Sequence, residues 1–447
     1  MIANIKEFFN KSKHDIDLLL LGLLVFSLPF ERLPSKDIFG VTIRASLIIG
    51  GLLLVRVIYL LITKKLKFKW NWLYIVIAMF VGWVFLIVPE SINLKRGLQI
   101  AVFDGFVIGV GVAVSLVYKK EYLKQLIAIL LLSATLVSAF AIYQFFGDVI
   151  GLPGYLTGIQ ERYNSALFGF PRVQAASLEP LYFGSYLLLP TLITYSLFVT
   201  NNNLVISKKV QCVLILLFST IIFMTVARGA IFGLVVGFVV LALIALVKKA
   251  SQMINVAILL GLIIASFALS FLMINYASKL PVDISKTFGK KGGAAFTQQI
   301  TSTGFEGDGD ERAKSRARAL VILNENKSAY IIGIGPGQYG PYVANNQPEY
   351  YGWPIVNNLT LELLVETGII GLGLILAFFF GLIWRGVKLI DIERKDQIAV
   401  VTSLGIVAYF ASQALQFQTF SSLYIMHIWV AAGLLLGMIT AVKLRKS

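Results

Sequence analysis

Twelve long apolar runs limit what this chain can fold into. Most are about 20 residues long, the length that an α-helix needs to cross the hydrocarbon core of a bilayer. The chain is 57% hydrophobic and 14% charged, whereas soluble proteins carry about 25% charged residues. We therefore predict an all-α, polytopic membrane protein with twelve spans, at residues 16–30, 43–63, 72–89, 98–117, 126–147, 178–199, 210–227, 230–247, 254–276, 357–384, 398–415 and 422–442.

The distribution of Lys and Arg between the loops predicts the orientation. If the N-terminus is cytoplasmic, the inner segments carry 21 Lys and Arg residues and the short outer segments carry 8. Because positive charge accumulates on the cytoplasmic side of membrane proteins, we expect both termini inside. The net charge of +16 follows from the same bias and does not indicate nucleic acid as a partner.

A long polar stretch between the ninth and tenth spans, residues 277–354, is predicted to face outward. We expect it to form a loop subdomain inserted in a single membrane domain that covers residues 1–447. It contains an arginine-rich segment, Gly307–Leu320, and a glycine turn, Gly333–Gly337. Loops of this length usually serve a function, so we expect this one to form a wall of the active site.

The scarcity of cysteine and histidine argues against a metal site. Cys212 is the single cysteine and lies in an apolar run, and the only histidines are His14 and His427. A disulfide framework is excluded for the same reason. The glycine turn Gly333–Gly337 lacks the Gly-x-Gly-x-x-Gly spacing of a dinucleotide site. We therefore predict neither a metal nor another cofactor.

Arginines at three places are predicted to reach the outer face. Arg172 precedes the sixth span, Arg228 lies between two apolar runs with almost no loop, and the long polar stretch carries Arg312, Arg316 and Arg318. A guanidinium group is always charged and binds phosphate through two N–H donors. Such a set suits a lipid diphosphate, whose charge it neutralises as the diphosphate leaves. The alternative is that single arginines only reach toward lipid head groups and fix the topology.

These elements occur in an order that resembles the O-antigen ligase and polymerase superfamily, over residues 100–440. The shared pieces are Arg172 with Glu179-Pro180, Ala227–Ala230, the arginine-rich segment, the glycine turn, and Asn357–Gly371 with Glu362 and Glu366. The resemblance implies a GT-C-type membrane glycosyltransferase of twelve helices. It implies a polyprenyl-diphosphate-linked glycan as donor and a hydroxyl group of a glycan, lipid or protein as acceptor. The reaction then takes place at the outer face of the cytoplasmic membrane, among membrane lipids, without a metal.

The resemblance also implies roles for individual residues. Arg172, Arg228 and Arg316 match the family's diphosphate-binding positions. We expect further substrate contacts from the remaining candidates of the same segments, which are Arg312, Arg318, Asn358 and Glu366.

One position departs from the family's pattern. Many members have His-Asn where this chain has Asn357-Asn358, and that histidine is thought to activate the acceptor hydroxyl. Because asparagine cannot serve as a general base, we expect Asn357 to orient the acceptor and a carboxylate to accept the proton. Glu179 is the first candidate, since a helix through this segment would place it on the same face as Arg172. Glu179 can instead pair with Arg172 and hold it.

Two further carboxylates, Glu362 and Glu366, are the next candidates for the base. The missing histidine leaves a polymerase, a ligase and other exopolysaccharide transferases open. A second class of protein also has twelve spans with inside termini: a transporter or flippase for lipid-linked glycans. Transporters commonly bind substrate near the bilayer midplane within internal repeats. This chain shows no repeat between its halves, and its long polar stretch comes late, so the sequence favours an enzyme.

Overall fold

The computed structural model describes the chain except at short gaps and in parts of the long polar stretch. The described residues are 1–32, 35–38, 41–66, 68, 70–248, 250–277, 293–294, 296–297, 308–346, 355–392, 396–421 and 423–443. Much of the predicted outer loop at 277–354 therefore lies outside the described residues, including Gly307, the first residue of the arginine-rich segment. The predicted division into one membrane domain and one loop subdomain remains a prediction.

The structure confirms an all-α, polytopic membrane protein. Ten of the described helices are long and apolar enough to cross a membrane. They are α3 (Ala45–Ile62), α4 (Trp72–Leu86), α5 (Leu94–Val117), α6 (Leu123–Val149), α9 (Pro180–Val199), α10 (Lys208–Thr225), α11 (Arg228–Lys248), α12 (Met253–Ala277), α17 (Leu359–Ile392) and α18 (Gln397–Gln416). Two shorter apolar helices, α2 (Ile16–Ser27) and α19 (Met426–Lys443), complete the correspondence with the twelve predicted spans.

The remaining elements are short or polar. The helices are α1 (Ile2–Ser12), α7 (Gly154–Thr157), α8 (Ser165–Phe168), α14 (Asp308–Glu325), α15 (Lys327–Ile332) and α16 (Tyr339–Asn346), with 3-10 turns at Val88–Glu90, Lys120–Tyr122, Glu161–Tyr163 and Ala250–Gln252. An antiparallel hairpin joins β1 (Ser35–Ile38) to β2 (Val41–Arg44). The sequence did not predict this hairpin, because strands of four residues are too short for a clear alternation of apolar and polar side chains.

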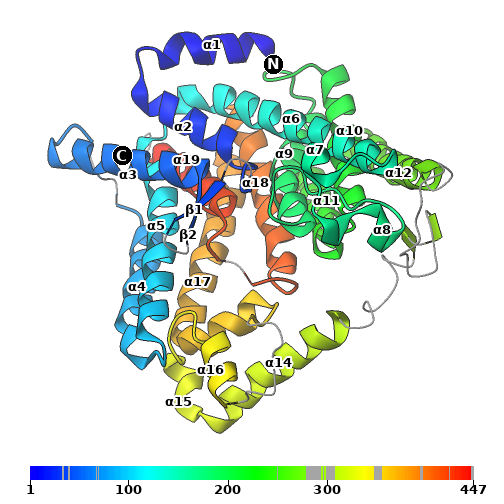
Figure 1. The fold of residues 1–447 in the computed structure, drawn as a ribbon. Coiled ribbons are helices and arrows are strands. Elements are labelled where there is room, and N and C mark those ends of the chain that lie inside the picture. The colour runs from blue at the N-terminus through cyan, green and yellow to red at the C-terminus, as the bar shows by residue number, and fades with distance from the viewer. Residues whose placement is uncertain are drawn as a thin grey trace. The chain divides into compact units, whose positions relative to one another are not determined.

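The chain divides into two compact units, each assembled from three segments. Unit 1 comprises Met1–Leu53, Lys119–Ser302 and Val387–Gln413. Unit 2 comprises Leu54–Tyr118, Thr303–Gly386 and Ala414–Ser447. The elements of both units are labelled in Figure 1.

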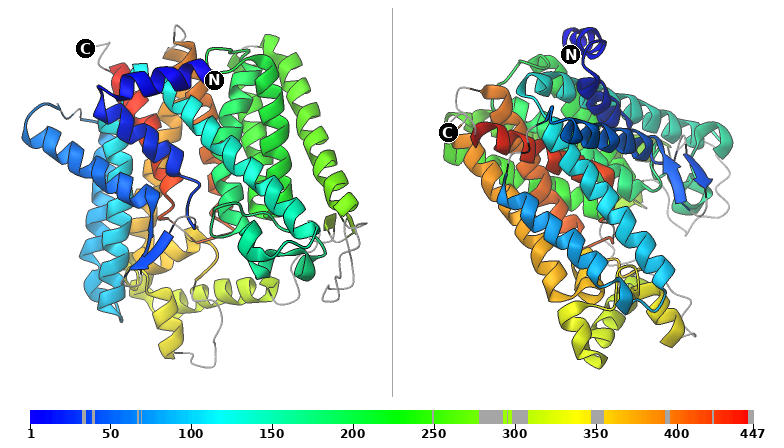
Figure 2. Two further views of the ribbon diagram at one scale, coloured as in Figure 1. Left: turned by 45° about the horizontal axis from the view of Figure 1, so that its top comes forward. Right: turned by 90° about the vertical axis from the view of Figure 1, so that its left-hand side faces the viewer.

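Helix α9 is the central helix of unit 1. It packs against α6, α10, α11 and α12, and Figure 2 shows α10, α11 and α12 running side by side as the green helices. Almost all of α9 is buried, so its polar side chains need partners within the protein. Thr191 and Thr194 supply such partners locally, because each hydroxyl donates to the carbonyl group one turn back, at 2.6 and 2.7 Å.

Unit 2 contains a core that joins the short helices of the polar stretch to α17. Its buried members come from α14, α15, α16 and the first part of α17, and include Ala319, Ile322, Ala329, Tyr339 and Val365. In the same unit α5 packs against α4 and α19. The described part of the predicted outer loop is therefore a packed structure rather than an extended connection.

The glycine turn Gly333–Gly337 is docked on a kink in α17. The kink lies at Gly368, whose φ of 67° and ψ of −177° are accessible only to glycine. A break in the helix frees carbonyl groups that normally accept from residues four positions later. Here the N–H groups of Ile334 and Gly335 bond to the carbonyl groups of Val365 and Glu366, at 3.0 and 3.1 Å. A Cβ atom at Gly368 would overlap the carbonyl group of Ile331.

Gly368→Ala should therefore destabilise unit 2. The added methyl group meets backbone atoms of Ile331 and the backbone conformation is strained, so we expect a loss of about 2 kcal/mol or more. The matched control is Gly373→Ala in the same helix, where a Cβ atom meets nothing within 4 Å. The control should be neutral or slightly stabilising. Thermal unfolding in detergent compares the two, and equal effects would contradict this role for the kink.

Candidate functional site

In unit 1 the structure brings Arg172 to the turn that carries Arg228. Helix α10 ends at Thr225, Val226 takes a left-handed conformation with φ of 50°, and α11 begins at Arg228. Arg172 donates from Nε to the carbonyl oxygen of Thr225 at 3.2 Å and from a terminal nitrogen to that of Val226 at 3.5 Å. The last carbonyl groups of a helix lack intrahelical partners and carry partial negative charge, so they hold a cation well.

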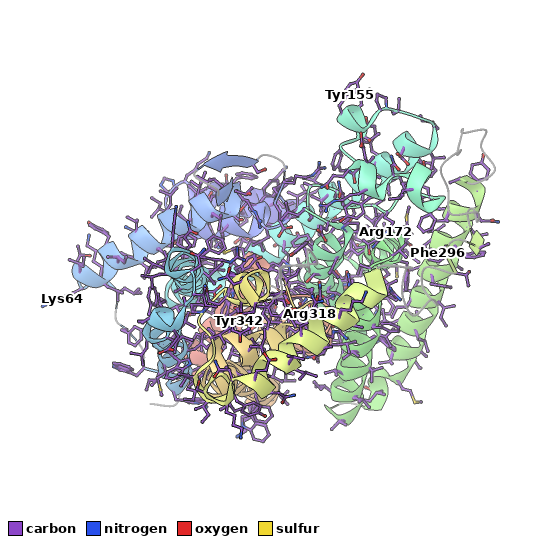
Figure 3. The ribbon with its side chains drawn as sticks, turned by 60° about the horizontal axis from the view of Figure 1, so that its bottom comes forward. Lys64, Tyr155, Arg172, Phe296, Arg318 and Tyr342 are labelled. Atoms are coloured by element: carbon purple, nitrogen blue, oxygen red, sulfur yellow. The ribbon has the colours of Figure 1, made fainter. Side chains whose placement is uncertain are left out.

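The loop before α9 fixes the backbone of Arg172. The backbone N–H of Arg172 donates to the carbonyl group of Tyr163 at 2.9 Å, and its guanidinium lies 5.7 Å from the Tyr163 ring centre. Ala175, with φ of 48°, is clamped by the buried amide of Gln144 through two hydrogen bonds of 2.8 and 3.1 Å. Figure 3 labels Arg172 at this part of the chain. These contacts give Arg172 a fixed position.

The helical segment expected between Arg172 and Glu179 is absent, and this part of the sequence analysis was wrong. Helix α9 begins only at Pro180, and Glu179 is extended, with φ of −147° and ψ of 158°. A proline disfavours helical backbone at the residue before it, which explains this start. Glu179 forms an ion pair with Arg162 at 3.6 Å, and its side chain is 36% exposed.

Glu31 is a carboxylate that the sequence analysis missed. Its side chain is 8% exposed, one oxygen accepts from the N–H of Leu178 at 3.4 Å, and the other lies 3.7 Å from a nitrogen of Arg44. Burial raises the pKa of Glu31, the charge of Arg44 opposes this rise, and the charge of neighbouring Glu179 adds to it. The signal in the sequence was weak: a single acid directly after an apolar run, which we counted only as part of an outer loop.

In unit 2 the structure joins Arg316 to Asn357. A terminal nitrogen of Arg316 donates to the carbonyl oxygen of Gln418 at 2.8 Å and to that of Asn357 at 3.4 Å. Arg312 and Arg318 lie on the same helix, α14, and both are half-buried; Figure 3 labels Arg318 there. Arg316 thus contacts Asn357, a second predicted site residue.

Asn357 and Asn358 prepare the start of α17 in different ways. Asn357 is buried and has φ of 56°, a conformation that asparagine tolerates better than most residues. Asn358 caps the helix, since its side-chain oxygen accepts from the N–H of Leu361 at 3.0 Å. Its side-chain nitrogen donates to the amide oxygen of Gln418 at 3.2 Å. Asn358 therefore has a structural use in addition to the predicted contact with substrate.

The two glutamates of α17 hold backbone groups. Glu366 accepts from the N–H groups of Gly337 and Tyr339, at 2.8 and 3.0 Å, and so fixes the glycine turn. Glu362 accepts from the N–H of Val356 at 3.1 Å. These contacts give Glu362 and Glu366 a structural use at the start of α17 and in the glycine turn. Within the described residues, no group of three or more His, Cys, Asp and Glu side chains is placed to hold a metal ion.

Comparison with known families gives one match. The family described as O-Antigen ligase matches residues 213–376. The matched segment includes Arg228, Arg316, Asn357 and Glu366, whereas Arg172 and Glu179 lie before it. A search of curated proteins found no match to the chain.

Glu31→Gln tests the burial of this carboxyl group. Because the folded-state pKa of Glu31 is raised above its ordinary value of 4.5, the folded protein binds this proton more tightly than the unfolded chain. The wild type should then lose stability as pH rises from 4.5 through the raised pKa, and the glutamine variant should not. We expect the melting temperature of the variant, relative to wild type, to increase between pH 4 and pH 7. If the difference in melting temperature between the variant and wild type does not change with pH, the raised pKa of Glu31 is contradicted.

Proposed function

We propose that the chain is a membrane glycosyltransferase that uses a polyprenyl-diphosphate-linked glycan as donor, in keeping with the match of residues 213–376 to the O-Antigen ligase family. The acceptor is a hydroxyl group of a glycan, lipid or protein, so a polymerase and a ligase both fit. The reaction takes place at the outer face of the cytoplasmic membrane, with both termini in the cytoplasm. The observation that supports the proposal is the contact of Arg172 with the carbonyl groups of Thr225 and Val226, in the α10–α11 turn that precedes Arg228.

The reaction exchanges one bond at the donor sugar. The acceptor hydroxyl oxygen attacks the anomeric carbon, and a new glycosidic bond forms. The bond between that carbon and the phosphate oxygen breaks, and polyprenyl diphosphate leaves with the electron pair. The hydroxyl proton passes to a base. Catalysis then requires stabilisation of the charge that grows on the diphosphate and a group to accept the proton.

Arg172 and Arg228 are the proposed diphosphate ligands. The two carbonyl groups that Arg172 contacts belong to Thr225 and Val226, just before Arg228. Arg228 is the first residue of α11, where the N–H groups of a helix carry partial positive charge. Helix N-termini that combine such N–H groups with arginines are suited to anions such as phosphate. Both features support a diphosphate at this turn.

Glu179 is the proposed base in unit 1. Its side chain is 36% exposed and forms an ion pair with Arg162 at 3.6 Å. Glu31 lies beside the same helix start through its bond to Leu178. In unit 2 we assign phosphate binding to Arg316, which backbone carbonyl groups hold in place, and orientation of the acceptor to Asn357. Arg312, Arg318, Asn358 and Glu366 are assigned supporting substrate contacts.

Arg172→Lys and Arg228→Lys should each reduce glycan transfer by a factor on the order of 10² or more. Lysine keeps the positive charge but loses the planar group with which arginine binds phosphate through two donors. Transfer is measured with purified protein and lipid-linked glycan from the native host. Arg385→Lys in α17, at the predicted cytoplasmic end, is the matched control and should transfer normally. Near-normal transfer by both site variants would contradict this role and indicate that the two arginines only fix the membrane topology.

Glu179→Gln separates the two roles open to this carboxylate. If Glu179 is the base, transfer falls by a factor on the order of 10² or more, while labelled undecaprenyl diphosphate still binds. The exposed neighbour Glu161 provides a control, and Glu161→Gln should change neither quantity. A parallel loss of diphosphate binding would instead assign Glu179 to holding the arginines.

A further inference from the structure

Two buried amide side chains in unit 2 lack hydrogen-bond partners. Asn357 is 3% exposed and its side-chain nitrogen has no partner. Gln416 is fully buried, and neither its side-chain nitrogen nor its oxygen has a partner. Among the described residues, Gln416 is the one amide whose two ends are both unsatisfied. Buried polar atoms without partners are rare in folded proteins, so such a side chain needs an explanation.

The two amides lie on segments that are tied together. The N–H of Leu359 donates to the carbonyl groups of Phe417 and Phe420, at 2.7 and 3.1 Å. The side chain of Gln418 donates to the hydroxyl of Thr360 at 2.8 Å. Arg316 bonds to both segments, through the carbonyl groups of Asn357 and Gln418. The amides are therefore carried by one cross-linked piece of structure within unit 2.

The backbone around both amides is also fixed. Gln416 is the last residue of α18, and its carbonyl oxygen accepts from the N–H and the hydroxyl of Thr419, at 2.7 and 2.8 Å. Asn357 takes a left-handed conformation directly before Asn358, whose side chain caps α17. The hydrogen-bonding groups of the two amides are thus open to a further molecule.

The chemistry of the free groups selects the class of that molecule. Gln416 offers a donor and an acceptor, and Asn357 offers a donor. A hydroxyl group both donates and accepts, so it can satisfy both ends of Gln416, whereas a phosphate oxygen only accepts. The neighbouring guanidinium of Arg316 donates from one terminal nitrogen to two carbonyl groups, while its Nε has no partner and is left for the phosphate role proposed above. We propose that Asn357 and Gln416 form a subsite for sugar hydroxyl groups of the glycan substrate, an inference that rests on the proposed function.

Gln416→Leu is the first test, because leucine has a similar size and no polar atoms. The probe is the water-soluble oligosaccharide released from the host's lipid-linked pool, and its binding to the full-length protein is measured by calorimetry. We expect the variant to bind it more weakly by a factor on the order of tenfold or more. Without ligand, the variant should melt at the wild-type temperature or above, because an unsatisfied buried group is removed. A purely structural glutamine would instead lower the melting temperature.

The control is Gln125→Leu. Gln125 is also a buried glutamine with an unsatisfied side-chain oxygen, but it lies in α6 of unit 1, at the predicted cytoplasmic end. The Gln125→Leu variant should bind the oligosaccharide as tightly as wild type. If Gln416→Leu does not fold, Gln416→Asn replaces it, since the shortened amide keeps its polarity but cannot reach the same hydroxyl.

The outcomes separate this inference from the proposed function. Equal binding by wild type and Gln416→Leu would overturn the subsite and leave bound water as the partner. Equal loss of affinity for sugar-free undecaprenyl diphosphate would also overturn it, because Gln416 would then recognise phosphate. If wild type binds the oligosaccharide but transfers nothing, the proposed function fails and the subsite stands. Where transfer occurs, the half-saturation concentrations of donor and acceptor are measured for Gln416→Leu. The substrate whose value rises is the one whose sugar the subsite holds.

Discussion

The need to satisfy polar groups in apolar surroundings governs this structure. Helices that cross a bilayer bond their backbone groups internally, and a polar side chain among them must find a partner in the protein. Thr191 and Thr194 do so within α9. Where α17 is broken at Gly368, the N–H groups of the glycine turn replace the lost helical bonds. The unsatisfied amide groups of Asn357 and Gln416 are the basis of the proposed sugar subsite.

The same rule explains how the arginines are positioned. Arg172 is held by carbonyl groups at the end of α10, and Arg316 by the carbonyl groups of Asn357 and Gln418. Carbonyl groups orient a guanidinium and add no full negative charge of their own. Contacts of this kind are compatible with a further, anionic ligand. This arrangement is the physical link between the fold and the proposed binding of a diphosphate.

The spans were predictable because each depends on the local composition of about 20 residues. The residues at which helices begin were harder to predict. A helix was expected from Arg172 to Glu179, but the observed backbone shows that α9 begins only at Pro180. The roles of Glu31 and Glu366 could not be read from the sequence. Glu31 meets Leu178 and Arg44, and Glu366 meets Gly337 and Tyr339, through contacts between residues distant in the chain. Neither spacing nor composition encodes such pairings.

Reconstitution of the purified protein in liposomes tests the central claim most directly. Lipid-linked glycan from the native host is supplied without an ion gradient, and the sugar-free polyprenyl diphosphate and the glycan products are both measured. The account predicts one released polyprenyl diphosphate for each glycan transferred to an acceptor. Movement of the lipid-linked glycan across the bilayer with no covalent change would contradict it and assign the protein to transport.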